Sequence, residues 1–83
     1  MEPKYSIELF PQGGGFETRV YREQQKPNGS YYPPELWQVW IGPDFDLDAP
    51  LRCKWEGDTE ITQISLSEMF PAEYEYLKAK LQA

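Results

Sequence analysis

The chain has 83 residues, of which 40% are hydrophobic and 16% aromatic, so we expect one small domain over residues 1–83 whose core depends on large rings. Fourteen acidic against eight basic residues give a net charge of −6, which disfavours general binding to nucleic-acid backbones and anionic membranes. The single cysteine excludes an internal disulfide and a zinc site made of several thiolates. Because neither a signal-peptide pattern nor an apolar run of about 20 residues is present, the expected location is the cytoplasm.

Two alternating segments near the N-terminus predict a β-hairpin. In residues 4–10 the apolar side chains recur at every second position, and residues 16–23 repeat this period. Three glycines, Gly13 to Gly15, lie between them and suit a tight turn. The same glycines invite comparison with a phosphate-binding loop, but they lead into a strand pattern and lack the Gly-Lys-Ser/Thr ending. We therefore assign them to the turn of the hairpin.

A turn-rich segment, residues 24–35, leads to a third predicted strand. Its Pro-Asn-Gly sequence is typical of turns, and the proline pair at 33 and 34 prevents a helix. Residues 36–42 then alternate again, and we place the face with the β-branched side chains inward. The inward residues are Trp37, Val39 and Ile41, and the outward residues are Leu36, Gln38 and Trp40.

Two further strands are expected in the second half of the chain. Residues 43–50 have a proline at each end and predict a loop, and residues 51–57 follow as a fourth strand. A turn at 56–59 and a fifth strand over 60–67 complete the pattern. The inward side chains of the fourth strand are expected to be Leu51, Cys53 and Trp55.

The spacing of apolar residues changes to that of a helix near the C-terminus. Phe70, Tyr74, Leu77 and Leu81 are three or four positions apart, and Pro71 suits a first helical turn. The sequence therefore predicts an α+β fold, in which an antiparallel β-meander of about five strands carries one C-terminal α-helix packed on one face.

The residue types argue against catalysis. Histidine is absent, so neither a Ser-His-Asp triad nor a Cys-His pair can form. Cys53 is expected to be buried and inert, with a raised pKa, because it points inward between apolar neighbours. Paired carboxylates would need a deep substrate cleft, which a small meander rarely encloses. We predict a protein that is not an enzyme and uses no cofactor.

The acidic loop at 43–50 resembles the start of a calcium-binding loop. Asp44, Asp46 and Asp48 have the spacing of the first EF-hand ligands, but the sixth and twelfth places hold Ala49 and Trp55 instead of glycine and glutamate. The pattern therefore fails as an EF-hand, and no metal site is predicted. A weak calcium or magnesium site of another kind is the alternative to a solvated acidic loop.

The outward face of the predicted sheet indicates a second kind of partner. It combines aromatic and basic side chains, as do domains that stack single-stranded nucleic acid. The negative net charge opposes this, and the charged residues also suit cross-strand pairing. Binding of single-stranded nucleic acid or a carbohydrate is therefore the alternative function, with direct nucleic-acid binding disfavoured. The residues concerned are Arg19, Tyr21, Trp40, Arg52 and Lys54.

Acidic residues in the second half of the sequence favour a basic partner protein. If the loop at 43–50 and the turn at 56–59 lie at one end of the meander, their carboxylates form one negative surface. Such a surface suits a small acidic regulator or inhibitor. In its strong form it imitates a nucleic acid, as small acidic inhibitors of phage or mobile-element origin do. The acids concerned are Glu35, Asp44, Asp46, Asp48, Glu56, Asp58 and Glu60.

Aromatic residues beside these acids complete the predicted binding surface. Tyr31, Tyr32 and Trp40 exceed what the core requires, and aromatic anchors next to charges are typical of protein interfaces. The alternative is that the Tyr–Pro segment folds back over the open side of the sheet. We predict a non-catalytic protein-binding module. A homodimer in which an exposed edge strand pairs with its copy is the alternative assembly. The predicted partner-binding residues are Tyr31, Tyr32, Trp40, Asp44, Asp46, Asp48 and Asp58.

Overall fold

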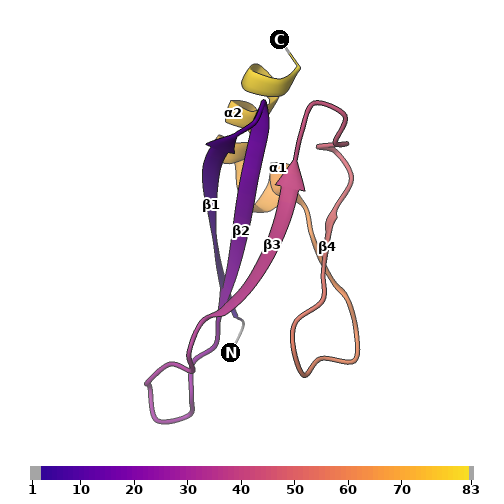
Figure 1. Cartoon of the computed structure of the whole chain (residues 1–83). Helices are drawn as coiled ribbons and strands as arrows, with labels where there is room; N and C mark the ends of the chain where they lie inside the picture. Colours follow the sequence, from indigo (N-terminus) through magenta and orange to yellow (C-terminus); the bar gives the residue numbers. More distant parts are fainter. Residues whose placement is uncertain (1–2, 83) are drawn as a thin grey trace.

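Three long strands form the main sheet. The computed structural model describes residues 3–82. In it, β1 (Lys4–Gln12), β2 (Gly15–Glu23) and β3 (Glu35–Ile41) pair antiparallel in that order (Figure 1). Because more buried and more exposed side chains alternate along each strand, the sheet has one face turned towards the core, which we call the inner face.

A separate two-stranded sheet follows. β4 (Leu51–Cys53) pairs antiparallel with β5 (Thr62–Ile64), and within residues 3–82 neither strand joins the main sheet. The five antiparallel strands are confirmed, but they are divided between two sheets. The division falls at the loop over 42–50, whose closing proline has no N–H for a strand ladder and directly precedes β4.

Two helices end the described part of the chain. α1 (Leu66–Met69) is one short turn, and its first two residues belong to the stretch that the sequence pattern assigned to the fifth strand, so that boundary is wrong. Ile64, the last residue of β5, and Leu66, the first residue of α1, are both buried. The strand-like alternation of apolar residues therefore continues beyond the end of β5, and the pattern does not indicate where the strand ends. α2 (Pro71–Leu81) begins at its proline, as expected, and the α+β class is confirmed.

The core lies between the inner face of the main sheet, the small sheet and the helices. The residues predicted to point inward from the fourth strand are buried, and Trp55 is only 1% exposed. Trp37 and Val39 are half-buried and pack against the same cluster. Helix α2 contributes the fully buried Leu77. The buried apolar residues are Phe16, Val20, Ile41, Leu47, Leu51, Cys53, Trp55, Ile64, Leu66, Phe70 and Leu77.

An ion-paired arginine joins the main sheet to the β4–β5 connection. The side chain of Arg22 is 8% exposed, and its Nε donates to Glu35 Oε2 at 2.6 Å while its Nη1 donates to Asp58 Oδ2 at 2.8 Å. Its guanidinium also lies 4.9 Å from the ring centroid of Trp55. The hydrogen bonds from the arginine hold the pKa of both carboxyl groups below the usual range.

The thiol of Cys53 is expected to be unreactive in the folded protein. The residue is a free cysteine and fully buried, and burial raises its pKa to about 11. A disulfide-forming reagent at mildly alkaline pH should therefore modify it slowly in buffer and rapidly in urea, because only a thiolate in contact with solvent attacks. The released chromophore measures both rates. Equal rates in the two solutions would contradict the burial of this side chain.

Candidate functional site

The outer face of the main sheet is open to solvent. Phe10, Leu36 and Trp40 are 40%, 48% and 46% exposed, although each belongs to a strand. Figure 1 shows that the connection between β2 and β3 extends beyond the end of the sheet instead of lying over it. The alternative in which the Tyr–Pro segment covers the sheet is therefore wrong, and the surplus aromatic residues stay accessible.

At one end of this face, the ring of Trp40 packs against the backbone of two glycines. A Cβ added to Gly15 would lie 2.7 Å from a ring carbon of Trp40, and one added to Gly42 would lie 3.0 Å from its indole nitrogen. The indole therefore rests directly against the backbone at both positions, in space that other residues would fill. A side chain fixed in this way loses little conformational entropy when a partner binds.

The three glycines of the hairpin thus have two different roles. Gly13 and Gly14 have φ angles of 56° and 87°, as a two-residue turn with positive φ at both central positions requires. Gly15 is already part of β2, and its missing side chain makes room for Trp40. The turn assignment is confirmed. The second role was not predictable from the run of glycines, because it depends on a residue of the third strand.

The loop over 42–50 places carboxylates in the segment that follows Trp40. Asp44 is exposed and lines, with Trp40 and Phe45, a shallow hollow of about 300 Å³. Asp46 Oδ1 accepts a hydrogen bond from the backbone N–H of Asp48 at 3.0 Å. The loop is therefore held in a definite shape with its carboxylates facing solvent.

Two contacts anchor this acidic loop to the body of the protein. Leu47 is 2% exposed and belongs to the core cluster, so it fixes the middle of the loop. The hydroxyl of Tyr74 on α2 donates to Asp48 Oδ1 at 2.6 Å, and this bond raises the pKa of the tyrosine. The sequence pattern placed Tyr74 on the core stripe of the helix and did not reveal this second function.

Tyr31, Tyr32 and Asp58 lie at the other end of the main sheet from Trp40. The two tyrosines precede the first residue of β3, whereas Trp40 is next to its last residue, and a strand of this length spans about 20 Å. They are 55% and 51% exposed in the connection between β2 and β3. Asp58 is bonded to Arg22, which pairs across the strands with Glu35, the first residue of β3.

The expectation that the acidic loop and the 56–59 turn share one end is therefore wrong. In an antiparallel arrangement, consecutive connections lie at alternate ends of the strands. The loop over 42–50 connects β3 to β4 at one end, and the 54–61 connection joins β4 to β5 at the other (Figure 1). The predicted site residues thus form two groups. Trp40 lies with Asp44, Asp46 and Asp48, whereas Tyr31 and Tyr32 lie towards the end that holds Asp58.

Of the three basic residues expected beside Trp40, Arg19 shares its outer face, whereas Arg52 and Lys54 lie outside the main sheet. Arg19 is half-buried, and its guanidinium lies 4.7 Å from the ring centroid of Phe10. Arg52 belongs to β4 in the other sheet, and Lys54 follows that strand. The residue that pairs with Trp40 across the sheet is Glu17, an acid. The aromatic face therefore lacks the row of positive charges that a nucleic-acid backbone requires.

The described residues show neither a metal centre nor a membrane-spanning helix. Within residues 3–82, no three histidine, cysteine, aspartate or glutamate side chains lie together in a way that could hold a metal ion, and this includes the carboxylates of the acidic loop. None of the helices in this range is long and apolar enough to cross a membrane. Comparisons with protein-family models, curated proteins and solved structures give no match.

Proposed function

We propose that this protein is a non-catalytic protein-binding module that docks through Trp40 and the neighbouring acidic loop. The observation that supports this proposal is Trp40 itself, which is 46% exposed and yet held against Gly15 and Gly42. Tryptophan is enriched among the residues that dominate binding energy at protein interfaces, and its fixed position lowers the entropic cost of association.

The charge of the surface indicates a partner with basic residues. Asp44, Asp46 and Asp48 are exposed in an anchored loop, and the whole chain carries a net charge of −6. Negative charges around an aromatic anchor accelerate encounter with a positive surface and discriminate against acidic partners. A small acidic regulator or inhibitor of such a protein is the specific role that we propose.

Replacement of Trp40 by alanine tests this proposal. The wild-type chain is immobilised, a partner is captured from a lysate of the source cells, and the purified partner is then titrated against each variant. We expect Trp40→Ala to weaken binding by about 2 kcal/mol, or roughly 30-fold, because an interfacial anchor is lost. Tyr31→Ala is the matched control, because it removes an aromatic side chain of similar exposure outside the proposed surface.

A triple change of Asp44, Asp46 and Asp48 to asparagine tests the electrostatic part. Asparagine keeps a side-chain oxygen for the hydrogen bonds from Asp48 N–H and Tyr74 Oη, so the loop retains its acceptors. Affinity should fall at low salt and differ little from wild type at high salt, where charges are screened. A partner bound equally well by Trp40→Ala, or capture of nucleic acid alone, would refute the proposed function.

A further inference from the structure

β1 forms an open edge of the main sheet. The strand order is β1-β2-β3, so within residues 3–82 β1 is paired on one side only. Gln12 and Gly15 are register partners on either side of a two-residue turn, a geometry that makes them a hydrogen-bonded pair, and such pairs occur at every second position along antiparallel strands. By this alternation the backbone N–H and C=O groups of Tyr5, Ile7 and Leu9 point away from β2.

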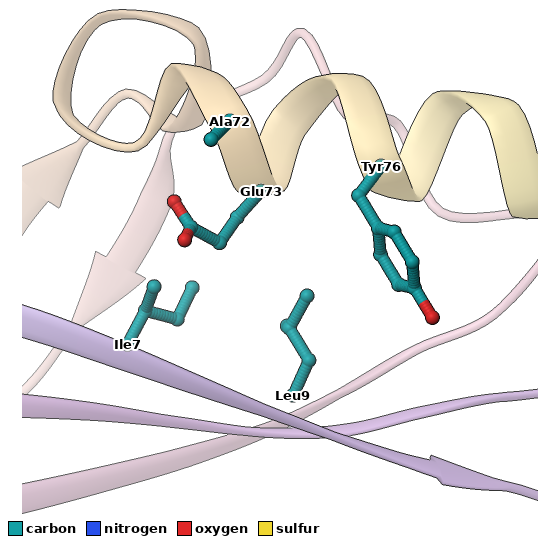
Figure 2. A pocket seen from close by; sticks show the side chains of 5 residues that line it. All are labelled: Ile7, Leu9, Ala72, Glu73 and Tyr76. Carbon is teal, nitrogen blue, oxygen red and sulfur yellow. The ribbon is translucent and has the colours of Figure 1, made fainter.

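A groove lies between β1 and α2 on the inner face of the sheet. It has a volume of about 340 Å³ and is lined by Ile7 and Leu9 from the strand and by Ala72, Glu73 and Tyr76 from the helix. Figure 2 shows the strand side chains pointing towards the helix, opposite the carboxylate of Glu73 and the ring of Tyr76. Ile7 and Leu9 therefore offer backbone groups to the edge and side chains to the groove.

The open part of the edge is short and has defined ends. Lys4 at its start is charged, and Pro11 near its end has no N–H, which are two features that hinder strand pairing. The interval from Tyr5 to Leu9 contains no proline. At about 3.3 Å per residue, this interval matches an extended segment of about five residues.

We propose that this edge and groove accept an extended segment of a partner protein by β-strand addition. The incoming strand hydrogen-bonds with the outward backbone groups of Tyr5, Ile7 and Leu9 and continues the main sheet. Every second side chain of the incoming strand enters the groove, and those that contact Ile7 and Leu9 are apolar. A lysine or arginine of the segment faces Glu73, the charged residue of the groove.

Charge favours a partner segment over a second copy of this chain. Pairing of two β1 strands would bring two Glu73 carboxylates to one apolar seam between chains that each carry −6. An apolar segment with a basic residue instead neutralises Glu73. The groove lies on the face of the sheet opposite Trp40, so this inference does not rest on the function proposed for that surface.

The test uses a phage-displayed library of random peptides on the intact chain, followed by synthesis of the enriched peptide. We expect enrichment of alternating apolar residues with a lysine or arginine. On saturation with that peptide, hydrogen exchange measured by NMR should slow at least about tenfold for the outward amides of Tyr5, Ile7 and Leu9. The amides of Ser6 and Glu8 should change little, because they already face β2.

Two variants separate this inference from other modes of binding. Glu73→Gln should weaken binding of the basic peptide about fivefold without changing the alternating protection. The Asp44/Asp46/Asp48→Asn variant should bind it as well as wild type, whatever happens to the Trp40 surface. Absence of enriched peptides, protection that does not alternate along β1, or a dimer in sedimentation that protects the same amides would each overturn the proposal.

Discussion

Replacement of Gly15 by alanine is expected to reduce the stability of the fold and to displace Trp40 at the same time. The added Cβ would lie 2.7 Å from the carbonyl oxygen of Ile41 and 2.7 Å from a ring carbon of Trp40. Because Ile41 is the last residue of β3 and pairs with Phe16, its backbone cannot move aside without disturbing the strand ladder. We expect the free energy of unfolding to fall by about 1–3 kcal/mol.

Urea unfolding and the indole N–H signal of Trp40 in NMR spectra measure the two effects of Gly15→Ala. The matched control is Gly13→Asn, because a Cβ at Gly13 would lie 4.0 Å from the Trp40 ring, which is an ordinary contact. Asparagine tolerates positive φ, and Asn-Gly is the preferred pair for this turn, so the control should keep both stability and signal. If Gly15→Ala matched this control, Trp40 would not rest against Gly15.

Replacement of Arg22 by methionine is expected to destabilise the protein at neutral pH by about 2 kcal/mol. Removing one member of a buried ion pair usually costs about 3–5 kcal/mol. We expect the smaller loss of about 2 kcal/mol because water can hydrate the carboxylates left behind. Glu35 and Asp58 are 31% and 38% exposed. With a urea m-value of about 1 kcal/mol/M, the unfolding midpoint should fall by about 2 M. Arg52→Met, on the exposed side of β4, is the control and should change stability little.

The effect of Arg22→Met should decrease as the pH falls. The arginine lowers the pKa of Glu35 and Asp58 in the folded state, so the unfolded state binds protons more readily than the folded state. This contribution to stability is present above about pH 4.5 and is lost as the pH falls through the lowered folded pKa values. Urea midpoints of wild type and variant should therefore converge in acid. A difference that stays constant from neutral pH to pH 3 would show that Arg22 acts through packing on Trp55 alone.

The local elements were predictable because each depends on residues that are close in the sequence. The period of two predicted the strands β1, β2 and β3. It also predicted that Trp37 and Val39 point inward, although both are only half-buried. The change to a helical period, together with Pro71, predicted the start of α2. The end of β5 was not predictable in this way, because Ile64 and Leu66 are buried on both sides of the boundary.

The candidate site was only partly predictable. The pattern correctly placed Trp40 on the outward side of its strand, beside a loop with three aspartates. It wrongly joined this loop to the 56–59 turn, although the alternation of connections in antiparallel strands could have separated them. The bond between Asp58 and Arg22 joins residues 36 positions apart, and no local period indicates it.

By itself, the sequence determined the α+β class, the antiparallel strands, the burial of Cys53 and the outward position of Trp40. These features follow from side-chain period and from turn residues, which act over a few positions. Only the tertiary structure decided that the strands form two sheets, that Asp58 belongs to an internal ion pair and that glycines hold Trp40. It also created the groove between β1 and α2, because the residues that line this groove come from opposite ends of the chain.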